Sequence, residues 1–230
     1  MSQPTIFISG ASKGIGLAIA RVFYQQQFRV VICARGEAGL QAAKAEMPDL
    51  ITYTCDVSNK SEVQKMATWL NEEIGSLEVL VNNAGFFQPG EVHAEADEVY
   101  ESMLRTNMDS TYYLTKGVIP LMKKEAKGTI FNIASIASLK AYANGGSYSI
   151  SKFAMLGFSK NLREELKPHG IRVMSVMPGA TFTASWEGVD VPKERLMPPE
   201  DVASMIWAMY NTSYRTVVEE IIIRPMLGDL

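Results

Sequence analysis

Short segments rich in valine, isoleucine and leucine recur along the chain, and segments with helical spacing of apolar residues separate them. Repeated strand–helix units of this kind produce parallel strands, because each crossover helix carries the chain back to the same end of the sheet. The pattern therefore predicts an α/β fold in which helices cover both faces of a doubly wound parallel sheet of about seven strands, a three-layer α/β/α arrangement. The expected strands are residues 5–9, 29–34, 51–55, 77–81, 128–134, 171–177 and 217–224.

Helical periodicity is expected over residues 15–27, 61–74, about 97–123, 148–166 and 199–211. A chain of 230 residues can form one such domain. We expect residues 1–230 to form a single domain, with the functional motifs in 1–183, a short loop at 184–198, and a last helix and strand in 199–230. The helices over 97–123 and 148–166 carry apolar residues around much of their circumference, which indicates either a wide core stripe or a contact in a homodimer or homotetramer.

Charge and hydropathy exclude several classes of partner. The formal charge is −3 and the chain has no long basic run, so nucleic acid and anionic membrane surfaces are not expected partners. No signal-peptide pattern and no apolar run of about 18 residues occurs, which predicts a cytoplasmic protein. Cys33 and Cys55 are expected to be buried free thiols, and His93 and His169 belong to no metal-ligand cluster, so no metal site is predicted.

Three glycines follow the first expected strand in the segment SGASKGIG. Gly10, Gly14 and Gly16 lie where the strand turns into a helix, where glycine permits a tight turn and close approach of a ligand to the backbone. The N-terminus of the following helix suits a pyrophosphate. The spacing resembles the T-G-x-x-x-G-x-G motif of the short-chain dehydrogenase/reductase family, with Ser9 in place of the threonine, and this resemblance implies a Rossmann-type nucleotide-binding fold.

The residue after the second strand is expected to select the nucleotide. A carboxylate there would bind the ribose of NAD, whereas a cation would pair with the 2′-phosphate of NADP. Arg35 occupies this place and Lys13 lies in the glycine loop, which favours NADP(H), although Glu37 keeps NAD(H) as the less favoured alternative.

The segment SYSISK places Tyr148 and Lys152 four residues apart on one helix face. A neighbouring ammonium group favours the phenolate, so we expect Lys152 to lower the pKa of Tyr148 toward neutrality, where an acid–base catalyst is most useful. Ser135 follows the fifth strand, at the edge of the sheet where ligands bind in such folds.

Ser135, Tyr148 and Lys152, together with Asn107, resemble the catalytic set of the short-chain dehydrogenase/reductases, including 3-oxoacyl carrier-protein reductases and carbonyl reductases. The likeness runs from about Pro4 to Thr183 and continues more weakly beyond it. It implies that Tyr148 donates a proton to a carbonyl oxygen, that Ser135 stabilises that oxygen, that Lys152 binds the nicotinamide ribose, and that Asn107 holds a water. The predicted cofactor-binding residues are Gly10, Ser12, Lys13, Gly14, Ile15, Gly16, Arg35, Asp56, Val57, Asn83, Ala84, Gly85, Tyr148, Lys152, Pro178, Gly179, Thr181 and Thr183.

Phe86, Phe87, Tyr142 and Trp186 are predicted to line the substrate crevice, which suggests a medium-sized apolar or aromatic ketone or a 3-oxoacyl thioester, or the corresponding alcohol. For each aromatic residue, simple packing is an equally open alternative. Two other classes remain open for the chain as a whole: an NADP(H)-sensing regulatory protein on the same fold, and a lyase with an altered nucleotide pocket. Among enzymes of the same class, an NAD-dependent alcohol dehydrogenase is the alternative to the predicted NADP-dependent reductase.

Overall fold

The computed structural model describes residues 3–124, 127–186 and 188–230. Its centre is one parallel sheet with the strand order β3-β2-β1-β4-β5-β6-β7. The strands are β1 (Thr5–Ser9), β2 (Arg29–Ala34), β3 (Ile51–Thr54), β4 (Val79–Asn82), β5 (Gly128–Ile133), β6 (Ile171–Pro178) and β7 (Glu220–Ile223). The predicted doubly wound fold is confirmed.

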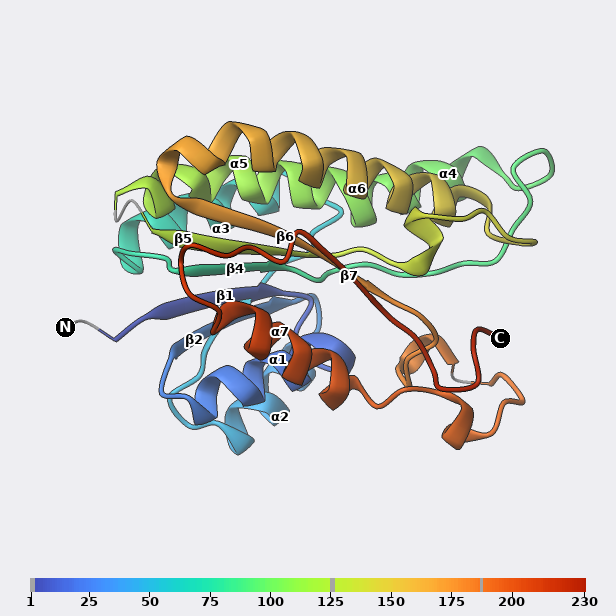
Figure 1. Ribbon diagram of the computed structural model, residues 1–230, viewed down its shortest axis with the longest axis horizontal. Helices are drawn as coiled ribbons and strands as arrows, with labels where there is room; N and C mark the ends of the chain where they lie inside the picture. The colour runs from blue at the N-terminus through green and yellow to red at the C-terminus, as the bar shows by residue number, and fades with distance from the viewer. Residues whose placement is uncertain (1–2, 125–126, 187) are drawn as a thin grey trace.

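The helices form a layer on each face of the sheet (Figure 1). One layer contains α1 (Gly14–Gln25), α2 (Glu37–Glu46) and α7 (Pro199–Tyr210), and the other contains α3 (Lys60–Glu73), α4 (Asp97–Leu104), α5 (Ser110–Lys123) and α6 (Gly146–Leu166). Helix α2 is absent from the sequence prediction. Only Leu40 and Ala43 of this helix are buried, so its apolar stripe is too narrow to give a clear helical pattern.

Two hydrophobic cores lie between the sheet and its helix layers, because strands of a covered parallel sheet bury both of their faces. Ile6, Ile8 and Ile32 face α1 and α7, whereas Phe7 and Leu80 face the layer of α3, α5 and α6. The strand order reverses between β1 and β4, which opens a crevice beyond the carboxyl ends of these two strands. The candidate site residues gather at this edge.

The expected helix over 97–123 is divided in the structure. A π-helical turn, η1 (Arg105–Asp109), separates α4 from α5 and contains Asn107. Helices α5 and α6 contribute buried residues to the core, but Tyr112 on α5 and Ile150 and Phe153 on α6 are exposed. Each of these helices therefore has a core stripe, as the first alternative predicts, together with an exposed apolar side; the contact between copies of the chain stays a prediction.

Both cysteines are buried and free, as expected. Over the described ranges, none of the helices combines the length and the apolar character that a bilayer crossing requires.

Candidate active site

The glycine loop joins β1 to α1 at the carboxyl end of β1, in the middle of the sheet. Gly10 has a φ of +65°, and a Cβ atom at this position would lie 2.7 Å from the Cα atom of Ala84. The N-cap of α1, Lys13, makes no side-chain hydrogen bond to the helix. The loop thus offers bare backbone and a helix N-terminus without a side-chain cap, which is the arrangement that a pyrophosphate fits.

Hydrogen bonds tie the glycine loop to the end of β4. The Ser9 hydroxyl oxygen accepts from the backbone N–H groups of Asn83 and Ala84, both at 3.1 Å. In return, Nδ2 of Asn83 donates to the carbonyl oxygens of Ser9 and Gly10, both at 2.9 Å. The Asn83 side-chain nitrogen therefore holds the loop, a structural role that the resemblance did not include.

The two cations predicted to select the nucleotide lie beside this loop. Arg35 directly follows β2, and it is exposed, as is Lys13. The start of α2 packs on the glycine loop, since a Cβ atom at Gly39 would lie 2.9 Å from the Cβ atom of Ser12. Neither cation forms an ion pair within the described residues, so both charges face solvent at the mouth of the crevice.

The end of β3 is held by local hydrogen bonds. Asp56 Oδ1 accepts from the backbone and the hydroxyl of Ser58, at 3.0 and 2.8 Å. The N-cap of the helix that follows, α3, is Asn59, whose Oδ1 accepts from the backbone N–H groups of Ser61 and Glu62. Val57 is buried and belongs to the second hydrophobic core.

Ser135, Tyr148 and Lys152 meet beyond the ends of β5 and β6. Ser135 is the N-cap of the short 3₁₀ turn η2 (Ile136–Ser138), and its hydroxyl oxygen accepts from Ala137 N–H at 3.1 Å. Its side chain lies close enough to the Tyr148 phenol to lower the pKa of that group. Lys152 Nζ donates to the carbonyl oxygen of Ile133 at 2.9 Å and lies 5.7 Å from the centroid of the Tyr148 ring.

The ionisation of this pair differs from the sequence prediction. Burial raises the pKa of Tyr148 above its ordinary value, and the Ser135 side chain opposes that effect. Burial lowers the pKa of Lys152 to about 8. The expectation that Lys152 lowers the tyrosine pKa toward neutrality is wrong for this structure, because the loss of hydration that accompanies burial is the dominant effect on both groups.

Asn107 links the π-helical turn to the site. Its Oδ1 accepts from Phe86 N–H at 2.9 Å, and its Nδ2 donates to the Phe86 carbonyl at 3.1 Å and to the Ser151 hydroxyl at 3.0 Å. The Ser151 hydroxyl donates in turn to the Tyr148 carbonyl at 2.7 Å. The Asn107 side chain thus braces the segment after β4 against the first turns of α6. Ser151 was not selected from the sequence, where a serine inside a helix carries no distinguishing signal.

The segment after β6 approaches the glycine loop from the other side. A Cβ atom at Gly14 would lie 3.3 Å from the Thr183 methyl group. Pro178 ends β6, Gly179 N–H donates to the Ile223 carbonyl at 2.7 Å, and the Thr181 hydroxyl donates to the Gly179 carbonyl at 3.0 Å.

Three further residues predicted to bind the cofactor pack against other parts of the protein. Ile15 packs on the first core. A Cβ atom at Gly16 would lie 2.5 Å from Asn83 Nδ2, and one at Gly85 would lie 3.0 Å from Asn107 Oδ1. These close approaches bring the glycine loop, the end of β4 and the π-helical turn together.

The four aromatic residues predicted to line one crevice are not equivalent. The Phe87 ring packs edge-on against Tyr148 with centroids 5.0 Å apart. Burial, with a smaller effect of Tyr148, raises the pKa of Tyr142 to about 12, so this side chain also lies near the phenol. Phe86 is fixed through its backbone by Asn107, and Trp186 lies in the 3₁₀ turn η4 (Ala184–Trp186). Within the predicted substrate loop 184–198, residue 187 lies outside the described residues.

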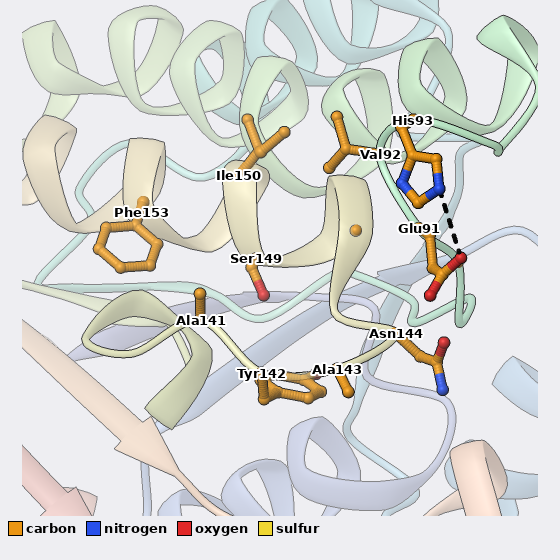
Figure 2. Close-up of a pocket in the computed structure, with 12 residues that line it drawn as sticks. Glu91, Val92, His93, Ala141, Tyr142, Ala143, Asn144, Ser149, Ile150 and Phe153 are labelled. Atoms are coloured by element: carbon orange, nitrogen blue, oxygen red, sulfur yellow. Dashed lines mark ion pairs between the residues drawn. The ribbon is translucent and has the colours of Figure 1, made fainter.

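A cavity of about 510 Å³ lies beside this chemical centre (Figure 2). Val92, Tyr142, Ile150 and Phe153 give it a largely apolar wall, but Ser135, Tyr148 and Lys152 do not line it. It uses the face of α6 that carries Ser149 and Phe153, about 100° around the helix from Tyr148 and Lys152. Of the predicted substrate residues, Tyr142 alone reaches it.

Comparison with known proteins gives relatives over nearly the full length. A family model described as short chain dehydrogenase matches residues 4–192. Sepiapterin reductase of Chlorobaculum tepidum is 35% identical over 98% of this chain and 97% of its own length. The closed form of serine dehydrogenase complexed with NADP+ superposes with a TM-score of 0.90 at 30% identity, covering 98% of this chain and 96% of that one. A variant of actinorhodin polyketide ketoreductase with NADPH gives a TM-score of 0.90 at 29% identity, covering 99% and 98%.

Proposed function

The chain belongs to the short-chain dehydrogenase family, and from that premise we propose that it is an NADP(H)-dependent reductase that interconverts a carbonyl compound and its secondary alcohol. The observation that carries the proposal is the meeting of Ser135 and Tyr148 over a buried Lys152. Their place beyond the carboxyl ends of β5 and β6, beside the glycine loop, is where a reaction on a bound dinucleotide would occur.

The residues around the crevice fit NADP(H). Gly10 and Gly14 leave room for the pyrophosphate at the N-terminus of α1, and Asn83 holds this loop in place. Arg35 and Lys13 present two positive charges where the 2′-phosphate would lie, and a guanidinium group pairs well with a phosphate dianion. The NADP+ and NADPH bound by the serine dehydrogenase and the ketoreductase support the same choice over NAD(H).

The cofactor would supply or accept the hydride, and the protein residues manage the proton and the charge. Tyr148 donates its proton to the carbonyl oxygen during reduction, and its raised pKa keeps the phenol in the protonated form that this step needs. Ser135 donates a hydrogen bond to the same oxygen and stabilises the negative charge that develops there. Lys152 provides a positive charge near the phenol and would bind the ribose hydroxyls of the cofactor, while Asn107 holds the surrounding backbone.

The substrate that we propose is a medium-sized apolar or aromatic ketone, or a 3-oxoacyl thioester. Phe87 and Tyr142 provide apolar surface next to the phenol on which such a molecule would pack. A panel containing sepiapterin, 3-oxoacyl thioesters and simple aryl ketones, with serine for the oxidative direction, covers both this proposal and the names of the relatives.

NADPH fluorescence and turnover test the proposal together. We expect the protein to bind NADPH and to reduce at least one member of the panel. Tyr148→Phe should keep NADPH binding and lose turnover by about 100-fold or more, because general acid catalysis contributes at least this much. A Tyr148→Phe variant as active as the wild type would refute the mechanism, whereas binding without turnover of any substrate would favour an NADP(H) sensor.

We also propose that the exposed apolar side of α5 and α6 is covered by a second copy of the chain. Tyr112, Ile150 and Phe153 are between 39% and 46% exposed and lie on these two helices. Sedimentation should therefore give a homodimer or a homotetramer rather than a 25.4 kDa monomer.

A further inference from the structure

The carboxylate of Glu95 lies at the N-terminus of α6, the helix that carries Tyr148. Its Oε1 accepts a hydrogen bond from the backbone N–H of Ser147 at 3.2 Å and another from the Ser147 hydroxyl group. Glu95 belongs to the segment between β4 and α4, and 52 positions separate it from Ser147 in the sequence. The contact therefore joins two parts of the chain that only the fold brings together.

The second carboxylate oxygen occupies space that two glycines leave open. A Cβ atom at Gly90 would lie 2.7 Å from Glu95 Oε2, and one at Gly146 would lie 2.8 Å from the same atom. Gly146 also has a φ of +39°, which glycine adopts without steric cost. This oxygen is buried and has no hydrogen-bond partner among the described residues. This oxygen of the carboxylate is thus enclosed between the two segments.

The segment around Glu95 is also attached to the start of α6 through its backbone. Gly90 N–H donates to the Asn144 carbonyl at 3.1 Å, and Gly90 and Gly145 form an isolated parallel bridge. Figure 2 shows Glu91, Val92 and His93 of this segment opposite Asn144 and the first turn of the helix. The Glu95 carboxylate joins the same two segments.

The first turn of α6 lacks a cap of its own. The residue at the N-cap position is Gly145, and no side chain at this position accepts from the helix. The unpaired N–H groups and the positive end of the helix dipole favour a negative charge here, and a hydrogen bond to a carboxylate is stronger than one to a neutral group. Glu95 therefore does, from a distant segment, what an N-cap residue usually does.

We propose that Glu95 is a positioning residue for Tyr148. Tyr148 is the third residue of α6 and directly follows Ser147, whose side chain is fully buried. Holding Ser147 fixes the backbone from which the phenol extends toward Ser135. The role of Tyr148 as the acid rests on the function proposed above, whereas the anchoring of its helix turn does not.

The effect should be confined to the first turn of the helix. Helix α6 has 21 residues. Beyond its first turn it is held in the fold by buried side chains, which include Lys152, Met155, Leu156, Ser159 and Leu162. Loss of one cap cannot unfold a helix that is anchored in this way, but it can release the turn that carries the phenol.

Four variants test the assignment. Glu95→Ala removes the cap, Glu95→Gln keeps an acceptor without the charge, and Ser147→Ala removes the hydroxyl contact. Glu91→Ala is the matched control, because Glu91 lies on the same segment and its side chain is 59% exposed. The ¹³Cζ NMR signal of Tyr148, assigned with Tyr148→Phe, and amide exchange at Ser147 and Tyr148 are measured in the protein without ligand. The kcat and the KM for NADPH are measured in parallel.

We expect Glu95→Ala to speed amide exchange at Ser147 and Tyr148 about tenfold, to move the Tyr148 signal and to lower kcat about tenfold, with the KM for NADPH unchanged. Glu95→Gln and Ser147→Ala should give smaller changes of the same kind, and Glu91→Ala none. If Glu95→Ala does not fold, the same readouts on Glu95→Gln decide the question.

Wild-type exchange and a wild-type Tyr148 signal in both Glu95 variants would overturn the assignment. Altered exchange and an altered signal in a protein that reduces no substrate would instead support the positioning role while removing the proposed reductase function.

Discussion

Replacing Lys152 by methionine should stabilise the protein without ligand while abolishing turnover. Only 4% of the Lys152 surface is exposed, and burial lowers its pKa from 10.5 to about 8. At about 1.4 kcal/mol per pKa unit, holding this charge inside the protein costs about 3 kcal/mol at neutral pH. Loss of the hydrogen bond to the Ile133 carbonyl offsets part of that gain, typically by about 1–2 kcal/mol. The net increase in the free energy of unfolding should therefore be about 1–2 kcal/mol at pH 7.

The pH dependence provides the sharper test. Below about pH 8 the lysine is charged in the folded and unfolded states, so the wild type bears the whole cost. Between about 8 and 10.5 the folded state releases the proton while the unfolded state keeps it, and the stability of the wild type rises with pH. The difference in stability between the two proteins should accordingly change by about 2–3 kcal/mol between pH 7 and pH 10, which removes the advantage of Lys152→Met and makes the wild type the more stable protein at pH 10.

Urea unfolding of both proteins at several pH values in this interval measures the difference directly. The exposed Lys65 on α3 provides a control, because Lys65→Met also removes one lysine but from the surface. A stability difference between wild type and Lys152→Met that stays constant from pH 7 to pH 10 would contradict the argument, since burial of the charge would then cost nothing.

Three other perturbations follow from the geometry of the site. Gly10→Ala should weaken NADPH binding about tenfold in a fluorescence titration, because the new Cβ atom would combine a left-handed φ with a clash against Ala84. Gly157→Ala on α6 is the control and should bind NADPH normally, because its Cβ atom would meet open space. Arg35→Ala should reduce the preference for NADPH over NADH, measured as a ratio of kcat/KM values, about tenfold or more, and an unchanged ratio would exclude Arg35 from phosphate recognition. Because the pKa of Tyr148 is raised, the protonated phenol persists at neutral pH, so the rate of alcohol oxidation should increase as pH rises, and a falling rate would argue against Tyr148 as the base.

The doubly wound architecture could be predicted from the sequence because strand segments alternate with helices of clear apolar periodicity, and this alternation is typical of parallel sheets. The glycine loop, Arg35 and the Tyr148–Lys152 pair were found for a related reason: their spacing is local in the sequence. Helix α2 was missed because its buried stripe is only two residues wide.

The remaining features depend on contacts between distant segments. The contact of Glu95 with Ser147 and the hydrogen bonds of Asn83 to the glycine loop exist only once the sheet has formed. Whether the pKa of Tyr148 is raised or lowered likewise depends on how deeply the fold buries its ring. A tyrosine and a lysine four residues apart on a helix can be either exposed to water or buried. No local pattern carries this information.

The π-helical turn at Arg105–Asp109 also constrains how the length of this chain can change. Each residue of an α-helix advances the rotation by about 100°, so a deletion that converted this turn into regular helix would rotate α4 by that angle relative to α5. Met103, now fully buried, would swing away from the core, and the Asn107 amide would leave the Phe86 backbone. Single-residue deletions within this turn should therefore be far less tolerated than substitutions on its exposed side.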